Sequence, residues 1–90
     1  MKDIDDLRQR IDWIDEQLVR LLNARAECAL QVGQFKKACG MDIYQPERER
    51  EVLEHVQQLN TGPLDDDAIK RLFERVIDEN RRLERVADLE

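Results

Sequence analysis

An uninterrupted amphipathic pattern runs through residues 4–35, IDDLRQRIDWIDEQLVRLLNARAECALQVGQF. Its stripe positions recur three and four residues apart, which is the spacing of a helix that packs along its whole length. The positions of this stripe are Ile4, Leu7, Ile11, Ile14, Leu18, Leu21, Arg25, Cys28, Val32 and Phe35, with Arg25 as the charged exception. We therefore expect a single helix from about Asp3 to Ala38, ended by Gly40 as a left-handed cap.

A helix of this length is too long for the rest of the chain to cover. At ~1.5 Å per residue, about 36 residues make a rod of ~54 Å, whereas a 100-residue domain has a radius of gyration of only ~13 Å. The remaining residues cannot bury such a rod, so another chain must cover part of the stripe. The pattern therefore predicts a partner chain.

Two shorter helices are expected in the remainder of the chain. The first begins at Pro46, whose fixed φ suits the first helical position, and runs to about Leu59. The second is N-capped by one of the aspartates at 65–67. Charged residues make up 40% of the chain and hydrophobic ones 41%, but aromatic residues only 4%, a balance typical of amphipathic helices. With 90 residues, we expect one all-α domain of three helices that spans residues 1–90.

The net charge of −6 disfavours two classes of partner. Nucleic acids and anionic membranes require basic surfaces, so we expect neither as a partner. The start of the chain, MKDIDDLRQR, lacks the apolar core of a signal peptide, and no run approaches the roughly 18 apolar residues of a membrane span. Cys28 and Cys39 would lie ~16 Å apart on one helix, beyond the ~7 Å limit for a disulfide, which predicts free thiols. Together these features favour the cytoplasm.

Each expected helix carries polar residues on or beside its apolar stripe. In the first helix, Arg25 and Lys36 lie three turns apart on one face, with the small apolar surface of Ala29 and Val32 between them. The others are Arg48 and Glu49 in the second helix, Asn80 and Glu84 in the third, and Arg8 near the free end of the first. Buried unpaired charges are costly, so these groups must pair with one another, hold water or face a ligand cavity. From the pattern alone, a role in helix register and a cavity for a compact anion both remain open.

Four segments resemble the all-helical class of chorismate mutases: LRQRIDWIDEQLVRLLNAR (7–25), VGQFK (32–36), YQPERERE (44–51) and RLFERVIDENRRLE (71–84). The spellings ARAEC (24–28) and NTGPL (60–64) resemble in particular the mutase domain that many bacteria fuse to prephenate dehydratase. The resemblance implies an intertwined helical homodimer that converts chorismate to prephenate in phenylalanine and tyrosine biosynthesis. It implies no metal and no cofactor, because the reaction is an intramolecular Claisen rearrangement.

The cations of the resembling family bind the substrate, and they match four positions here. Lys36 matches the lysine that donates to the ether oxygen and to a carboxylate, so we expect it to contribute most to catalysis. Arg25 and Arg48 match arginines that bind the substrate carboxylates, and we group Arg48 with the catalytic residues. Arg8 matches the arginine that reaches into the site of the neighbouring subunit.

The remaining matches are uncharged or acidic. Glu49 matches the acid that accepts a hydrogen bond from the ring hydroxyl, and Val32 and Ile77 match apolar walls that hold the substrate in its compact shape. Asn80 takes a place that another small polar residue often holds near a carboxylate. At Gln45 the better-known pattern has an aspartate near the substrate hydroxyl, so we expect ring recognition to be looser or differently arranged here.

At Glu84, many members of the family carry a glutamine that donates to the ether oxygen. An ionised glutamate would repel that oxygen, so Glu84 must be protonated to help. We expect burial to raise the pKa of Glu84, with Lys36 and the arginines opposing the shift, and turnover to fall as the pH rises. The alternative is a surface ion pair with Arg81 or Arg85.

Three other functions fit the same helices. The altered Gln45 keeps isochorismate pyruvate-lyase and aminodeoxychorismate mutase open as activities of this fold. A non-catalytic helical dimer that acts as an interaction or regulatory module is the alternative from another class, in which the stripe charges would set the register of the helices.

Overall fold

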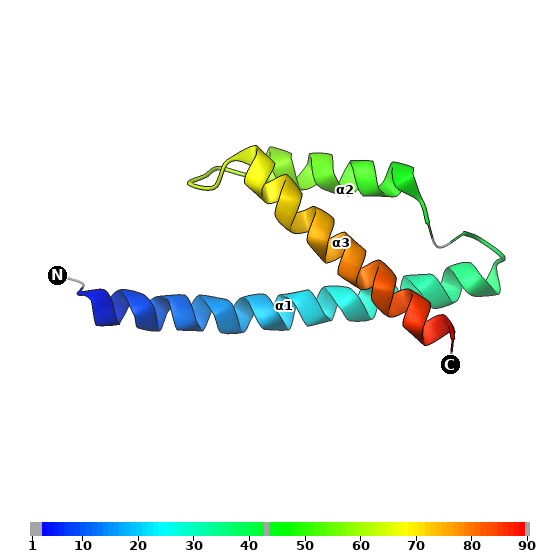
Figure 1. Ribbon diagram of the computed structural model, residues 1–90, viewed down its shortest axis with the longest axis horizontal. Coiled ribbons are helices and arrows are strands. Elements are labelled where there is room, and N and C mark those ends of the chain that lie inside the picture. Colours follow the sequence, from blue (N-terminus) through cyan, green and yellow to red (C-terminus); the bar gives the residue numbers. More distant parts are fainter. Residues whose placement is uncertain (1–2, 43, 90) are drawn as a thin grey trace.

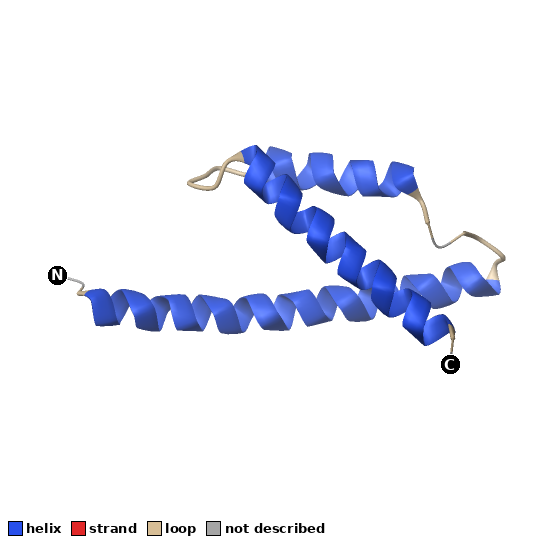
Figure 2. Ribbon diagram, viewed as in Figure 1, coloured by secondary structure: helices blue, strands red, loops and turns tan. Residues whose placement is uncertain are grey.

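The computed structural model describes residues 3–42 and 44–89, and within them it contains three helices and no strand (Figures 1 and 2). α1 spans Ile4–Ala38, α2 spans Pro46–Leu59 and α3 spans Asp66–Asp88. This confirms the all-α prediction of one long helix followed by two shorter ones. Both ends of α2 fall at the predicted residues.

Caps that the sequence contains define both ends of α1. The carboxylate of Asp3 accepts a hydrogen bond of 2.9 Å from the backbone N–H of Asp6. At the other end Gly40 has φ 69°, and the N–H of Met41 donates to the carbonyl of Lys36 at 2.7 Å. A residue in this left-handed conformation satisfies carbonyls that the last helical turn leaves unpaired. The predicted cap at Gly40 is therefore confirmed.

The turn between α2 and α3 is organised by Asn60. Its side-chain amide donates to the carbonyl of Leu64 at 2.7 Å and to the carboxylate of Asp66 at 2.9 Å. Its side-chain oxygen accepts a hydrogen bond of 3.2 Å from the N–H of Gly62. Asp65 then caps α3 by accepting from the N–H of the residue three positions later, at 2.7 Å. These bonds return the chain so that α3 packs against α2.

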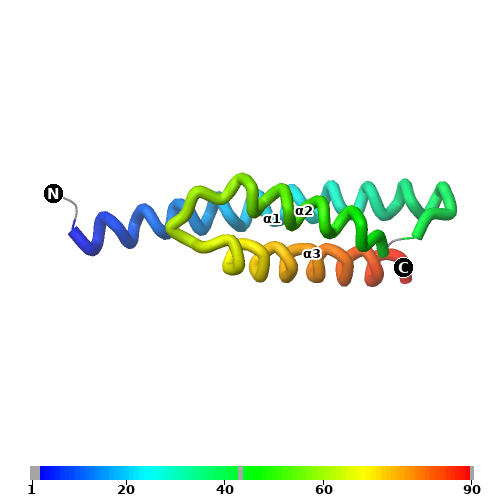
Figure 3. The backbone as a smooth tube through the Cα atoms, turned by 90° about the horizontal axis from the view of Figure 1, so that it is seen from above, coloured from blue at the N-terminus to red at the C-terminus, as the bar shows by residue number. Residues whose placement is uncertain are grey.

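α3 is the element that joins the other two. It packs along α2 and crosses the C-terminal half of α1, while α1 and α2 meet only through α3 and the connecting segment (Figures 1 and 3). The N-terminal half of α1 extends beyond both helices. The chain is accordingly elongated, with extents of 57 × 27 × 14 Å and a radius of gyration of 16.3 Å.

The described part of the single chain has no closed hydrophobic core. Among residues 3–42 and 44–89, no hydrophobic side chain is buried, and the stripe of α1 remains open, with Ile11 54% and Leu18 50% exposed. Charged residues interrupt this apolar surface, and none of the described helices has a stretch long and apolar enough to cross a membrane. An exposed stripe of this size is the feature that led us to predict a partner chain, and the homodimer that the resemblance implies stays a prediction.

Candidate active site

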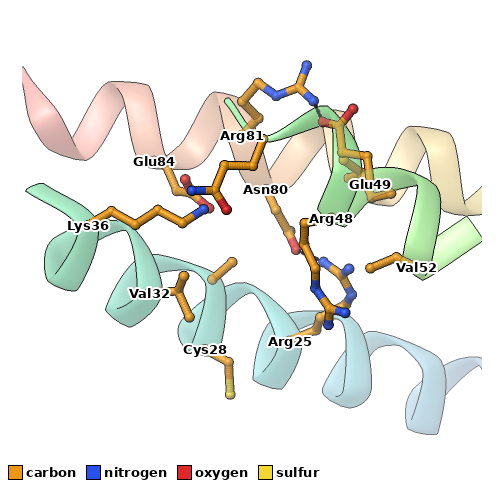
Figure 4. A pocket seen from close by; sticks show the side chains of 13 residues that line it. Arg25, Cys28, Val32, Lys36, Arg48, Glu49, Val52, Asn80, Arg81 and Glu84 are labelled. Atoms are coloured by element: carbon orange, nitrogen blue, oxygen red, sulfur yellow. Dashed lines mark hydrogen bonds and ion pairs between the residues drawn. The ribbon is translucent and has the colours of Figure 1, made fainter. Parts of the chain in front are cut away.

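A cavity of about 300 Å³ lies between the C-terminal half of α1, the first turns of α2 and the C-terminal half of α3 (Figure 4). Its walls combine apolar, cationic, acidic and amide side chains. They are Arg25, Cys28, Ala29, Val32, Lys36, Gln45, Arg48, Glu49, Val52, Ile77, Asn80, Arg81 and Glu84. The cavity thus brings together every site residue predicted from the sequence except Arg8.

α1 forms one wall of the cavity through residues that follow each other by one helical turn. Arg25, Ala29, Val32 and Lys36 lie along one face, as their spacing predicts. Figure 4 draws Arg25 at one end of the cavity and Lys36 at the other. The two predicted cations therefore flank a small apolar surface within one shared space.

Arg25 is held by a residue from the far end of the chain. Its Nη1 donates a hydrogen bond to the side-chain oxygen of Asn80 on α3, and Asn80 is buried. A hydrogen bond from a cation to a buried amide oxygen satisfies the amide and fixes the direction of the guanidinium. The charged exception in the α1 stripe is thus explained by a polar contact in the wall of the cavity.

The first turn of α2 contributes two neighbouring residues with different surroundings. Arg48 pairs with Glu51 at 3.2 Å, and its side chain is 67% exposed, more than we expected for a residue beside the buried stripe. The reason is its place in the first turn, where no other helix of the single chain covers it. Glu49 instead forms an ion pair with Arg81 on α3. Arg48 and Glu49 therefore line the same cavity with opposite charges.

Glu84 lies half-buried between α1 and α3 rather than on the surface. Its side chain packs against Gly33, where a Cβ would lie 3.3 Å from the Glu84 Cγ. Burial raises the pKa of Glu84 above its ordinary value, and the charges of Lys36 and then Arg81 oppose this shift. Both the direction and the opposing effect are those predicted. Arg81 pairs with Glu49 and with Asp78.

The charge of the cavity is opposite to that of the chain. Four cations and two carboxylates line it, so it carries two excess positive charges when all six groups are ionised, in a chain of net charge −6. The cations are Arg25, Lys36, Arg48 and Arg81, and the carboxylates are those of Glu49 and Glu84. A local field of this sign attracts a small dianion that the overall charge would repel.

Among the charged residues that line the cavity, Arg81 is the one that the sequence reasoning missed. It appeared there only as a surface partner for Glu84, yet its side chain is 25% exposed and lines the cavity. The available signal was its register, since position 81 lies one turn after Ile77 and one turn before Glu84. The charged residues beside Arg81 on α3 made this register hard to recognise in the sequence.

Arg8 is the predicted site residue that lies outside this cavity. It belongs to the N-terminal half of α1, which extends away from α2 and α3 (Figure 1). Its side chain is exposed. Within one chain, Arg8 therefore does not contribute to the site, and its assignment to the site of a neighbouring subunit stays a prediction.

The cysteines and acidic residues form no disulfide and no metal-binding cluster in the described part of the chain. Cys28 and Cys39 are free thiols, as predicted. Among residues 3–42 and 44–89, no three or more His, Cys, Asp or Glu side chains are grouped so that they could hold a metal ion.

Comparison with known sequences finds one family over most of the chain. The model of the family described as chorismate mutase type II matches residues 7–85. The chain is 44% identical over 86 residues to a bifunctional chorismate mutase/prephenate dehydratase of Neisseria gonorrhoeae. That alignment covers 91% of this chain and 23% of the other protein, so the chain spans about a quarter of the length of this curated relative.

Solved structures with the same fold are much closer in length. Form II of the chorismate mutase from Thermus thermophilus superposes with a TM-score of 0.90 at 30% identity, covering 93% of this chain and 96% of that one. The chorismate mutase from Helicobacter pylori in complex with prephenate gives a TM-score of 0.88 at 30% identity, covering 97% and 94%.

Proposed function

The chain belongs to the chorismate mutase type II family, and we propose that it catalyses the rearrangement of chorismate to prephenate. The observation that carries this proposal is the cavity, whose excess of positive charge and small apolar wall suit a compact dicarboxylate. A structural relative solved with prephenate bound supports the same substrate class. The proposed reaction belongs to the biosynthesis of phenylalanine and tyrosine.

The protein has to contribute little covalent chemistry to this reaction. The ether C–O bond of chorismate breaks while a C–C bond forms within the same molecule, and negative charge develops on the ether oxygen. No atom is transferred to or from the protein, and we expect no metal or cofactor. The enzyme has to select the compact conformer and place hydrogen-bond donors at the developing charge.

Three of the four lining cations contact the substrate in this proposal. Lys36 donates to the ether oxygen and to one carboxylate, so its interaction strengthens in the transition state. Arg25 and Arg48 bind the carboxylates at the other end of the cavity, where Figure 4 draws them together. Because Asn80 already orients Arg25, this arginine is held ready before the substrate arrives.

Glu84 is the second donor to the ether oxygen. Only its protonated form can donate, and burial raises its pKa and so increases the protonated fraction at a given pH. Figure 4 draws it beside Lys36, at the end of the cavity where we place the ether oxygen. Lys36, Glu84 and Arg48 form the proposed catalytic set.

The ring of the substrate is recognised by the remaining lining residues. Glu49 accepts a hydrogen bond from the ring hydroxyl, and Gln45 lies in the same cavity where the family pattern has an acid. Val32 and Ile77 press the substrate into its folded shape, and Asn80 contacts a carboxylate while it holds Arg25. Gln45 can donate as well as accept, so the hydroxyl end of the site is less acidic than in that pattern.

The working enzyme is a homodimer in this proposal. The exposed stripe of α1 packs against the second chain, and Arg8 of each subunit enters the cavity of the other. A partner of this kind would cover the open side at which Arg48 is exposed. We place the enzyme in the cytoplasm, where its two free thiols remain reduced.

The test is to follow chorismate absorbance with the purified protein and to assay prephenate as the product. Parallel incubations decide among the activities that the fold supports: isochorismate is tested by assaying salicylate and pyruvate, and aminodeoxychorismate is tested by following its loss and the formation of its rearranged isomer. Prephenate formation is the expected result. Turnover of another substrate instead would reassign the reaction, and an inert wild-type protein would favour a helical interaction module.

A further inference from the structure

We propose that Arg81 is a positioning residue for the reaction proposed above, because it holds Glu49 in the cavity wall and thereby orients the first turn of α2. This inference rests on the proposed function for its kinetic consequences. Its structural basis is a set of contacts that one guanidinium makes with both neighbouring elements.

Arg81 is the point at which α3, α2 and the segment before α2 meet. Its guanidinium forms an ion pair with Glu49 on α2 and lies 4.8 Å from the ring centroid of Tyr44, just before that helix. It also approaches Asp78 on its own helix at 3.7 Å. The Arg81 side chain is 25% exposed, whereas that of Arg75, which pairs with Glu79 within α3, is 75% exposed. Arg81 is therefore held by specific contacts with its neighbours and is not a solvated surface residue.

The ion pair matters because α2 has no direct packing on α1. The placement of α2 above the α1 wall depends on α3 and on the connecting segment. Arg48 and Glu49 are consecutive, so they project about 100° apart around the helix axis. In Figure 4, Glu49 points to Arg81 while Arg48 points toward α1. Fixing Glu49 on α3 therefore also fixes the direction in which Arg48 enters the cavity.

Arg81 has a second, electrostatic effect on the opposite end of the site. Its positive charge partly offsets the rise in the Glu84 pKa that burial causes. Glu84 borders this cavity and also a second one between α1 and α3, which Gly33, Lys37 and Asp88 line as well. The charged groups that share the two cavities with Glu84 are Arg25, Lys36 and Lys37 on α1, Arg48 and Glu49 on α2, and Arg81 and Asp88 on α3. Removing Arg81 takes away one cation and leaves Glu49 without this partner. Both changes disfavour the Glu84 anion, so the Glu84 pKa rises further.

Two substitutions separate the geometric role from the electrostatic one. Arg81→Met removes the charge and the ion pair, so KM rises about tenfold and the decline of kcat moves to higher pH. Arg81→Lys keeps the charge but loses the planar fork, so KM rises about threefold while the pH profile stays as in the wild type. Arg75→Met is the matched control on the same helix and leaves both quantities unchanged.

A double-mutant cycle tests whether Arg81 acts through Glu49. In a Glu49→Gln background, Arg81→Met raises KM by less than about twofold, because the pair is already broken. A full tenfold increase in that background overturns the inference. A wild-type KM in either Arg81 variant also overturns it. If Arg81→Met fails to fold, as judged by circular dichroism, the KM of Arg81→Lys alone decides in the same way.

The titration of the Glu84 carboxyl, followed by carbon-13 NMR, gives a readout that needs no turnover. Its pKa is higher in Arg81→Met than in the wild type and in Arg75→Met. An unchanged titration contradicts the electrostatic part of the inference. If the wild-type protein leaves chorismate unchanged, the proposed function fails, while this titration still decides on the inference about Arg81.

Discussion

The two halves of α1 follow one repeat but differ in what covers them. From Ile4 to Leu21 the stripe is apolar and remains exposed, with no other helix of the chain upon it (Figure 1). From Arg25 to Lys36 the helix lies beside α3, carries two cations on one face and lines a cavity. Gly33, the buried residue of α1, is in this second half, where Glu84 approaches it.

The difference shows how one periodicity can specify two kinds of contact. Packing an uncovered apolar stripe against another chain is favourable, by about 25 cal/mol for each Å² of apolar surface buried. A stripe that contains charged residues is instead stable next to a space in which those residues can contact polar partners. In our account, the first half of α1 serves the partner subunit and the second half serves its own.

Breaking the first half should have the largest effect. Leu18→Glu places a carboxylate in the apolar stripe, where burying each leucine would contribute ~1.5–3 kcal/mol and burying an unpaired charge would be opposed by desolvation. We expect monomers in light scattering and loss of nearly all activity. Gln9→Glu adds the same charge off the stripe and should leave a dimer. A Leu18→Glu protein that keeps the size and rate of the wild type would contradict our view of this half.

A substitution in the second half of α1 should lower activity less than loss of the dimer does. It should affect the chemical step and leave the fold and the dimer unchanged. Lys36→Ala removes a donor to the ether oxygen, and the loss of one such donor lowers kcat by about 10²–10³-fold. Lys37→Ala is the matched control, because Lys37 pairs with Asp88 at 2.7 Å outside the proposed site. Near-equal rates for the two variants would remove Lys36 from the mechanism. Circular dichroism and light scattering should be unchanged for both.

Gly33→Ala probes the close approach between α1 and α3. The added Cβ would lie 3.3 Å from the Glu84 Cγ, so the glutamate side chain has to shift by a few tenths of an ångström. We expect kcat to fall roughly tenfold, because a small misplacement of a catalytic group is costly. Helix propensity favours alanine by about 1 kcal/mol and offsets part of the crowding, so the melting temperature should change little. A normal kcat would mean that the position of Glu84 does not limit the reaction.

Glu84→Gln should have the smallest effect at acidic pH and a growing one as the pH rises. The Glu84 pKa is raised by burial, so the wild-type donor is present below that pKa and is lost as the pH rises through it. Glutamine donates at every pH, which should flatten the decline of kcat. Profiles of kcat against pH for the two proteins make the comparison. Identical declines would exclude Glu84 as the donor.

Local signals in the sequence were enough to predict the helices, and the family resemblance was needed to assign most of the residues that line the cavity. The spacing of the α1 stripe, Pro46 at the start of α2 and Gly40 after α1 determine where helices begin and end. Arg25 and Lys36 could be placed in one cavity because both lie on one face of one rigid helix.

Contacts between distant segments could not be predicted in the same way. The bond from Arg25 to Asn80 joins residues 55 positions apart, and it depends on how α3 crosses α1. Arg81 resembles the solvated arginines beside it, and its contacts with Glu49 and Tyr44 exist only once α2 and the segment before it are in place. Such pairings depend on tertiary packing, which periodicity along one helix does not encode.

The most direct test of the division between the two halves of α1 is a mixing experiment with Arg8→Ala and Lys36→Ala. Each variant alone should be nearly inactive, since each damages both sites of its homodimer. When the two are unfolded and refolded together, mixed dimers contain one site with an intact Lys36 and the Arg8 of the other subunit. We predict recovery of about a quarter of the wild-type rate, because half of the dimers are mixed and each has one intact site. A mixture no more active than the average of its two components would contradict the account.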